Sequence, residues 1–259
     1  MQVRNKVVVI TGAGSGIGRA LAEKFASKGA AKIICVDINS ANAQKTADKI
    51  GGVAMTCDVS KDAEIQRVID DTENTYGAID LFCSNAGIGM GESEQSPDRD
   101  WQTSWEVNVM SHVYAARHLV PRMLARGGGY FMNTSSAAGL LNQIGSATYG
   151  VTKHAAIGFG EWLALTYAHQ GIKVSMLCPQ AVRTAMTDRG KDTQNVRAAA
   201  TDGMLEPDVV ADIVVDGLNE ERFLILPHPE VEAYMQRKTG DYDRWIHGMN
   251  KLQRTLAGD

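Results

Sequence analysis

Short apolar runs rich in β-branched residues alternate along this chain with stretches of helical periodicity. The runs fall at 7–10, 32–36, 53–57, 79–84, 129–134, 173–178 and 223–226. The helical stretches fall at 19–28, 40–49, 61–76, 99–126, 149–169 and 207–220. Strands that are apolar on both faces and joined by helices predict a parallel sheet covered on both sides, because an antiparallel sheet with one wet face alternates apolar and polar residues. We therefore expect a doubly wound α/β fold.

No linker, repeat or low-complexity segment interrupts this alternation before about residue 226, which predicts a single domain over 1–259. The irregular stretch 184–205 is long enough to be a lid over a site, or a surface loop without a role in function. The segment 228–257 is expected to form a C-terminal helical extension, amphipathic and broken near Gly240. It could pack on its own subunit, close over the substrate pocket or contact another subunit.

Charge and cysteine spacing exclude several classes of function. A formal net charge of −4 without long runs of one sign argues against a nucleic-acid surface and favours small-molecule partners. The four cysteines share no C-x-x-C spacing and the six histidines have no metal spacing, so we expect reduced thiols, a cytoplasmic location and no metal site. We also expect no signal peptide and no membrane-spanning segment.

A glycine-rich turn, Thr11-Gly12-Ala13-Gly14-Ser15-Gly16-Ile17-Gly18, joins the first apolar run to the first helical stretch. Glycines at such a turn let the backbone approach a pyrophosphate, and the N–H groups of the helix N-terminus favour an anion. The spacing departs from G-x-G-x-x-G, because Ile17 stands in the place of the last glycine. The turn predicts a dinucleotide site, and its alternative is tight packing of helix on strand.

Asp37 ends the second apolar run, about twenty residues beyond this turn, where a carboxylate can bind both ribose hydroxyls of an adenosine. The same carboxylate would repel the 2′-phosphate of NADP, and neither Ser15 nor Ile38 brings a compensating positive charge. We therefore predict NAD as the cofactor. Arg19 is the one basic residue nearby, and it could soften this preference or lie on the solvent side of its helix.

Tyr149 and Lys153 are four residues apart, which places both on one face of a helix. A phenol works as an acid or base near neutrality only when its pKa of about 10 is lowered, and a neighbouring ammonium can do this. The pair suggests proton transfer, although the same spacing also occurs on the polar face of ordinary helices.

Five motifs together resemble the short-chain dehydrogenase/reductase family, in the right order and at the right distances. They are the Thr11-Gly12-x-x-x-Gly16-Ile17-Gly18 turn, Asn85-Ala86-Gly87, Asn108, Ser136 and Tyr149-x-x-x-Lys153. The resemblance spans the chain to about residue 226. It implies a Rossmann-like, seven-stranded parallel sheet, a nicotinamide cofactor and a homo-oligomer, a tetramer or a dimer.

The resemblance also implies roles for individual residues. Tyr149 would be the acid/base, and Lys153 would lower its pKa and hold the nicotinamide ribose. Ser136, thirteen positions before the tyrosine, would bind the substrate oxygen, with Ser135 as its rival. Asn108 would support a water-mediated proton relay, or it would only satisfy a helix irregularity. Cofactor contacts are expected from Gly12, Ser15, Gly16, Ile17, Gly18, Asp37, Asp58, Val59, Asn85, Ala86, Gly87, Tyr149, Lys153, Pro179, Val182 and Thr184.

The substrate is expected to be a hydrophobic secondary alcohol or its ketone, because the positions expected near the reacting carbon are mostly apolar. Gln180 departs from the glycine that the family usually has after the proline, and it would face the substrate edge or point away. The expected pocket comprises Ala138, Leu140, Gln143, Ile144, Gln180, Met186, Met204 and Leu205.

Three functions fit these residues. The first is an NAD-dependent alcohol dehydrogenase or ketone reductase. The second is an NADPH-dependent 3-ketoacyl reductase, which Asp37 opposes. The third is a dinucleotide sensor without catalysis, which would not need Ser136, Tyr149 and Lys153.

Overall fold

Seven parallel strands form one sheet in the computed structural model, which describes residues 1–190 and 192–258. Their order is β3-β2-β1-β4-β5-β6-β7. Because the chain runs outward from β1 to β3 and then returns to β4, the order reverses between β1 and β4. Such a reversal opens a crevice at the carboxyl ends of the strands. The strands are β1 (Val7–Thr11), β2 (Lys32–Asp37), β3 (Val53–Thr56), β4 (Leu81–Ser84), β5 (Gly129–Thr134), β6 (Ile172–Leu177) and β7 (Leu224–Ile225).

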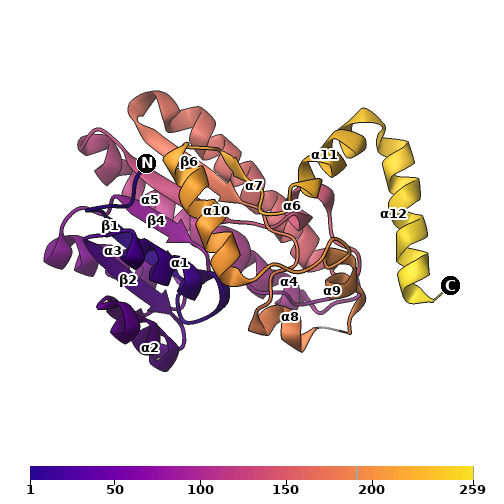
Figure 1. Cartoon of the computed structure of the whole chain (residues 1–259), viewed down its shortest axis with the longest axis horizontal. Helices are drawn as coiled ribbons and strands as arrows, with labels where there is room; N and C mark the ends of the chain where they lie inside the picture. Colours follow the sequence, from indigo (N-terminus) through magenta and orange to yellow (C-terminus); the bar gives the residue numbers. More distant parts are fainter. Residues whose placement is uncertain (191, 259) are drawn as a thin grey trace.

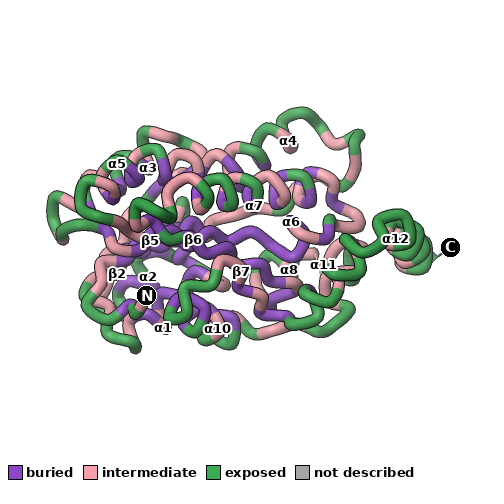
Figure 2. The backbone as a smooth tube through the Cα atoms, turned by 90° about the horizontal axis from the view of Figure 1, so that it is seen from above, coloured by how far each residue is buried: buried purple, intermediate pink, exposed green. Residues whose placement is uncertain are grey.

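Helices cover both faces of the sheet (Figure 2). One face carries α1 (Gly16–Ser27), α2 (Ser40–Ile50) and α10 (Pro207–Asn219), and the other carries α3 (Asp62–Tyr76), α5 (Ser111–Ala125) and α7 (Ala147–Tyr167). Neighbouring residues of β1 enter opposite cores, since Val8 packs with the α1 side and Val9 with the α3 side. This arrangement confirms the predicted Rossmann-like, doubly wound α/β fold.

The helical stretch predicted over 99–126 is divided into three parts. These are α4 (Asp98–Trp105), one π-helical turn (Glu106–Met110) and α5, which contains Pro121. A π-turn inserts one residue into an otherwise regular helix, and apolar periodicity over a long window does not register it. Asn108 lies in this turn and is buried. A short 3₁₀-helix (Ala168–Gln170) likewise follows α7.

Three short helices lie at the carboxyl edge of the sheet. Helix α6 (Ala138–Leu141) follows β5, and α8 (Ala185–Arg189) and α9 (Gln194–Ala199) lie within the stretch 184–205. Lys191, inside that stretch, lies outside the described residues. We call residues 184–190 and 192–205 the lid, after one of the two roles that the sequence allows for this stretch.

The C-terminal segment forms α11 (Glu230–Gly240) and α12 (Tyr242–Ala257), with the break where the sequence predicts it. We call residues 228–257 the C-terminal arm. Figure 1 shows α12 standing away from the sheet, on the side of the lid helices. The arm contacts α6 through Lys238, whose Nζ atom donates a hydrogen bond to the Leu140 carbonyl over 2.6 Å. None of the described helices combines the length and the apolar character that crossing a lipid bilayer requires.

Candidate active site

A cavity of about 430 Å³ opens at the carboxyl ends of the strands, where the order of the sheet reverses. Residues predicted from the sequence supply most of its lining: Gly12, Ser15, Gly16, Ile17, Asp37, Asp58, Val59, Asn85, Ala86, Gly87, Ser136, Tyr149, Lys153, Pro179, Gln180, Val182, Thr184 and Met186.

The glycine turn presents the N-terminus of α1 to this cavity. Ser15 stands at the N-cap in an extended conformation, and its side chain makes no capping hydrogen bond, so the first N–H groups of the helix stay open to a ligand. Gly14 meets Asp37 closely, and a Cβ atom there would lie 2.7 Å from Asp37 Oδ2. The turn therefore has the free donors that a pyrophosphate requires, and position 14 has no room for a side chain beside Asp37.

Asp37 lies at the end of β2 and is oriented by two backbone hydrogen bonds. Its Oδ2 atom accepts from Gly14 N over 2.9 Å, and its Oδ1 atom accepts from Asn39 N over 2.9 Å. Arg19 does not lie on the solvent side of α1, which was one of the two places considered for it. It is half-buried, and its guanidinium donates to the Gly14 carbonyl, so it supports the back of the turn.

Asn85 joins the ends of three strands beside the cavity. Its Nδ2 atom donates to the Thr11 carbonyl over 3.1 Å, and its Oδ1 atom accepts from the Thr134 hydroxyl over 3.1 Å. The Thr11 hydroxyl in turn accepts from Asn85 N over 2.9 Å. These bonds fix β1, β4 and β5 relative to one another, so the floor of the cavity is rigid.

Tyr149 and Lys153 lie near the start of α7 and both line the cavity. Lys153 is only 2% exposed, and its Nζ atom donates to the Thr134 carbonyl over 3.1 Å. Burial lowers the pKa of Lys153 to about 8. Burial also raises the pKa of Tyr149, and the Ser136 hydroxyl opposes this shift. The net direction for Tyr149 is opposite to the lowering expected from its proximity to Lys153, because burial disfavours the charged form of each group.

Ser135 and Ser136 have different partners, which separates the two rival serines. The Ser135 hydroxyl donates to the Lys153 carbonyl over 2.9 Å and so anchors α7 to the end of β5. The Ser136 hydroxyl donates to the Pro179 carbonyl over 3.2 Å and influences the ionisation of Tyr149. Both hydroxyls border the cavity, but of the two only Ser136 acts on the Tyr149 phenol.

Asn108 lies beside the cavity rather than in its lining. Its Oδ1 atom accepts from Ile88 N over 2.9 Å, and its Nδ2 atom donates to the Ile88 carbonyl over 2.9 Å. A Cβ atom on Gly87 would lie 3.3 Å from Asn108 Oδ1 and 3.2 Å from Lys153 Nζ, so the amide and the ammonium flank the same glycine. One turn further along, His112 is buried, and burial followed by the charge of Lys153 lowers its pKa to about 3. This imidazole is therefore neutral at physiological pH.

The segment after β6 forms the opposite wall, and we call residues 179–184 the nicotinamide loop, after the role that the family resemblance implies. Val182 pairs with Leu205 in a parallel bridge, which ties the returning end of the lid to this loop. Thr184 caps α8 together with Thr187. Gln180 borders the cavity, but its amide nitrogen donates to Asp202 over 3.2 Å, so the nitrogen is turned toward the lid.

Several residues predicted from the sequence do not line the cavity. Gly18 packs against the Gly12 carbonyl beneath the turn. Leu140 packs against the C-terminal arm, Gln143 donates to the Asn195 carbonyl over 2.9 Å, and Leu205 pairs with Val182. The predicted residues outside the lining are Gly18, Asn108, Ala138, Leu140, Gln143, Ile144, Met204 and Leu205.

The cavity also has lining residues that were not among the predicted site residues, although Ser135 was named as the rival of Ser136. Most of them flank a predicted motif by one or two positions, so proximity to the motif is the signal that could have found them. Arg189 differs, since it reaches the cavity from α8 and no local pattern distinguishes it from the other lid arginines. These residues are Ile38, Cys57, Ile88, Val107, Thr134, Ser135, Ala185, Thr187 and Arg189.

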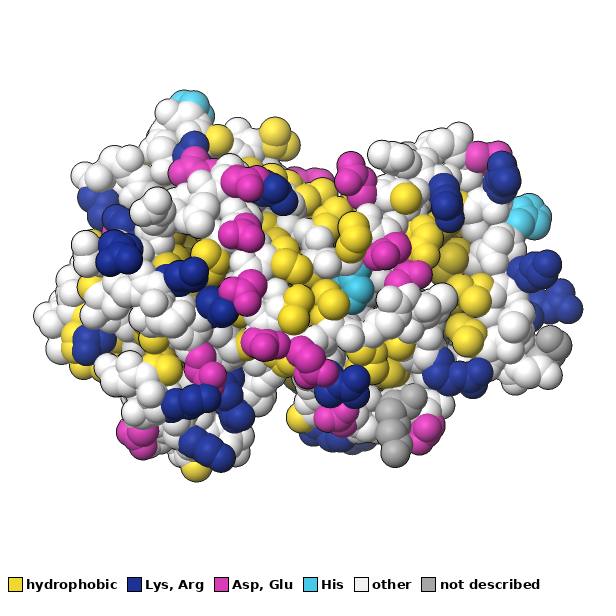
Figure 3. Space-filling model, viewed as in Figure 1, with side chains coloured by type: hydrophobic (Ala, Val, Ile, Leu, Met, Phe, Trp, Pro, Cys, Tyr) yellow, Lys and Arg dark blue, Asp and Glu magenta, His cyan; other side chains and the backbone are white. Residues whose placement is uncertain are grey.

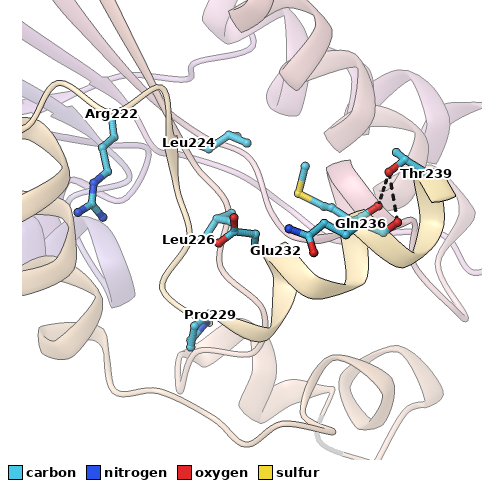
Figure 4. Close-up of a pocket in the computed structure, with 8 residues that line it drawn as sticks. Arg222, Leu224, Leu226, Pro229, Glu232, Gln236 and Thr239 are labelled. Carbon is cyan, nitrogen blue, oxygen red and sulfur yellow. Dashed lines mark hydrogen bonds between the residues drawn. The ribbon is translucent and has the colours of Figure 1, made fainter.

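A second cavity, of about 610 Å³, lies between the edge strand β7 and α11 (Figure 4). Its walls mix apolar side chains with Arg222, Glu232 and Gln236, and it contains none of the glycine-turn or α7 residues that line the first cavity. Nothing in its lining combines an acid/base pair with an anion site. The cavity at the carboxyl ends of the strands is therefore the candidate active site.

Comparison with known proteins places this geometry in a family. The model of the short chain dehydrogenase family matches residues 6–195. Cyclohexanol dehydrogenase of Acinetobacter sp. is 32% identical, over 84% of this chain and 89% of that protein. Epidermal retinol dehydrogenase 2 of Mus musculus is 33% identical, over 87% of this chain and 75% of that protein.

A solved structure shows the same architecture. A short-chain dehydrogenase/reductase from Burkholderia phymatum, crystallised in complex with NAD, superposes with a TM-score of 0.86 and 31% identity, over 94% of this chain and 96% of that one. The family's sequence model, its enzymes and its fold thus all match this chain. The protein belongs to the short-chain dehydrogenase/reductase family of nicotinamide-dependent oxidoreductases.

Proposed function

We propose that this protein is an NAD-dependent dehydrogenase or ketone reductase that interconverts a hydrophobic secondary alcohol and its ketone. The observation that carries the proposal is the grouping of Ser136, Tyr149 and Lys153 at one cavity, opposite the open N-terminus of α1. A dinucleotide sensor would need only the open N-terminus of α1, whereas proton transfer needs the group of Ser136, Tyr149 and Lys153.

The residues present fit a nicotinamide dinucleotide. The open N–H groups at the start of α1 suit the pyrophosphate, and the oriented Asp37 carboxylate suits the two ribose hydroxyls of the adenosine. The bound dinucleotide supplies the hydride acceptor for oxidation and the hydride donor for reduction. Asp37 supports NAD over NADP, because a 2′-phosphate would meet a carboxylate that two backbone N–H groups hold in place.

The protein's own groups would handle the proton and the substrate oxygen. Tyr149 takes the proton of the alcohol in oxidation and returns it in reduction. Ser136 donates a hydrogen bond to the same oxygen, where negative charge develops. Lys153 opposes the burial cost of a Tyr149 phenolate by its positive charge and holds the ribose beside the nicotinamide. Asn108, which binds Ile88 through both of its amide atoms, keeps the loop after β4 in place beside Lys153.

The apolar substrate class is supported by the lining beyond the catalytic groups. Ile88, Val107 and Met186 border the cavity, and the described lining contains one arginine, Arg189, and no cluster of basic residues that would select a phosphate or thioester carrier. Two relatives are named as dehydrogenases of cyclohexanol and of retinol, a secondary and a primary alcohol that both consist mainly of hydrocarbon.

A substrate panel with NAD⁺ and NADP⁺ tests the proposal. It should run from short alcohols through cyclic and aryl alcohols to steroids, with ketoacyl thioesters and NADPH as the contrasting arm. We expect the highest kcat/KM for an apolar secondary alcohol with NAD⁺. Preferred turnover of a ketoacyl thioester with NADPH would replace this function with the ketoacyl reductase. Dinucleotide binding without turnover of any substrate would favour the sensor.

Cytoplasmic location and assembly as a homodimer or homotetramer belong to the same proposal, and size-exclusion chromatography with light scattering measures the assembly.

A further inference from the structure

Asp202, near the returning end of the lid, connects two segments that are far apart in the sequence. Its Oδ2 atom accepts a hydrogen bond from Gln180 Nε2 over 3.2 Å, and its Oδ1 atom accepts one from the Tyr234 hydroxyl over 2.9 Å. Gln180 belongs to the nicotinamide loop and Tyr234 to α11. One carboxylate thus bridges the loop, the lid and the C-terminal arm, and we call these three residues the Asp202 bridge.

Backbone pairing places Asp202 beside the loop. Leu205 N donates to the Ala181 carbonyl over 3.1 Å, and Arg183 N donates to the Leu205 carbonyl over 2.9 Å. The lid therefore returns alongside residues 181–183, and the carboxylate three positions earlier reaches Gln180. A glycine at position 180 could not form this contact, because it has no side chain to offer.

The C-terminal arm makes a second contact with the same residue. The Nδ1 atom of His228 accepts a hydrogen bond from Gln180 N over 3.2 Å, and His228 is only 3% exposed. An accepting Nδ1 requires a neutral imidazole, and burial favours that form by lowering the pKa of His228. The arm therefore holds Gln180 in two ways. His228 binds the backbone N–H of Gln180 directly, and Tyr234 holds the side chain of Gln180 through Asp202.

The arm itself is anchored, so it can restrain the lid. Val231 is fully buried against Ala137 and Leu141, which belong to the segment directly after Ser136. At the other end of the arm, Arg197 of α9 donates to the Leu256 carbonyl over 3.3 Å. In the space-filling view, apolar side chains reach the surface between the body and the arm, next to acidic ones (Figure 3).

We propose that Asp202 is a positioning residue through which the C-terminal arm holds the lid against the nicotinamide loop. Loosening the Asp202 bridge lets the lid open more often and, on the proposed function, lets bound dinucleotide leave faster. Tyr149, Lys153 and Ser136 take no part in the Asp202 bridge, so loosening it leaves the groups that handle the proton in place.

Two conservative variants test the Asp202 bridge. Tyr234→Phe removes one hydroxyl, and Asp202→Asn removes the charge while keeping the shape. Tyr242→Phe is the matched control, since Tyr242 lies in the same arm, is 56% exposed and has no hydroxyl hydrogen bond within the described part of the chain. Hydrogen–deuterium exchange over residues 192–203 reports lid opening in the cofactor-free protein. Stopped-flow displacement of NADH reports release of the dinucleotide.

We expect both variants to speed lid exchange and NADH release by about two- to fivefold. This is the lower part of the range expected for the loss of one hydrogen bond, because hydrogen bonds of an exposed residue such as Asp202 contribute less than buried ones. The double variant should exceed the faster single variant by little, since both changes break one chain of contacts. Unchanged lid exchange in Tyr234→Phe, or fully additive effects in the double variant, overturns the proposal. Because exchange is measured without cofactor, failure of the wild-type protein to bind NADH contradicts the proposed function and not the Asp202 bridge.

Discussion

The Nζ atom of Lys153 lies 5.5 Å from the centroid of the Tyr149 ring, one turn away on α7. The same ammonium donates to the Thr134 carbonyl at the end of β5. This contact joins the helix that carries the proposed acid/base to the rigid floor of the cavity. The side chains of Tyr149 and Lys153 therefore keep a fixed relation to the sheet.

Replacing Tyr149 by Phe tests the acid/base role directly. The change removes the phenolic hydroxyl and keeps the ring, so we expect NADH binding to persist while kcat falls by roughly three orders of magnitude or more, the upper part of the general acid–base range. NADH fluorescence titration and steady-state kinetics measure the two quantities. Tyr167→Phe, at the far end of the same helix, is the control. Normal turnover in Tyr149→Phe would exclude the phenol as the acid/base.

Asp37→Ala should relax the discrimination between NAD and NADP. The variant removes the carboxylate that would repel a 2′-phosphate, so the ratio of kcat/KM for NAD⁺ to that for NADP⁺ should fall by about tenfold or more, corresponding to about 1.4 kcal/mol. Because Gly14 and Asn39 lose their acceptor, Tm should also fall slightly. Asp48→Ala, on the exposed face of α2, is the control. An unchanged ratio would remove Asp37 from the choice of cofactor.

The two neighbouring serines should respond differently to alanine. Ser136→Ala is expected to lower kcat by about 10² to 10³, because the hydroxyl acts on the substrate oxygen. It should also lower stability by about 1 kcal/mol, because the Pro179 carbonyl and Ala138 N lose their buried partner. Ser135→Ala should lower stability by about 1 kcal/mol, because the Lys153 carbonyl loses a buried hydrogen bond. Urea denaturation and steady-state kinetics on both variants make the comparison. A larger loss of kcat in Ser135→Ala than in Ser136→Ala would exchange the two assignments.

Lys153→Met should stabilise the cofactor-free protein near neutral pH. The pKa of Lys153 is about 8, below its ordinary 10.5 because of burial, so the folded protein releases this proton at a lower pH than the unfolded chain does. At pH 7 the wild type carries the full cost of a buried ammonium, and that cost declines as pH rises from 8 to 10.5. Methionine avoids the cost of a buried ammonium, so the variant should be more stable than the wild type by roughly 1–3 kcal/mol at pH 7. The range allows for the Thr134 carbonyl, which loses its hydrogen-bond donor.

The pH dependence distinguishes this effect from better packing. Urea denaturation at pH 7 and at pH 9.5 should show the advantage of Lys153→Met shrinking at the higher pH. Lys28→Met changes an exposed lysine and should show no such trend. An equal advantage at both values would mean that the charge of Lys153 is not its source. Activity of Lys153→Met should be lost at every pH.

Local pattern was enough to predict the architecture. Runs such as Val7–Thr11 and Lys32–Asp37 are apolar on both faces, which requires cover on both sides, and the glycine turn requires a strand before it and a helix after it. The Tyr149 and Lys153 pair needed only the period of the helix to place both side chains on one face. These features depend on residues close in sequence, and their geometry follows from backbone conformation.

Contacts between distant segments could not be predicted in this way. Asn108 in the π-helical turn binds Ile88, the Arg19 guanidinium binds the Gly14 carbonyl, and the Gln180 side chain binds Asp202. The substrate positions expected at Leu140, Gln143 and Leu205 lie outside the cavity lining for the same reason, since each is bound to the arm, the lid or the nicotinamide loop.

The sequence by itself thus determined the order of strands and helices, the place of the dinucleotide turn and the pairing of Tyr149 with Lys153, because each follows from short-range geometry. Only the tertiary structure decided the direction of the Tyr149 pKa shift, the different hydrogen-bond partners of Ser135 and Ser136, and the contact of the C-terminal arm with Gln180. Burial and long-range hydrogen bonding control these properties, and both arise only when the chain has packed.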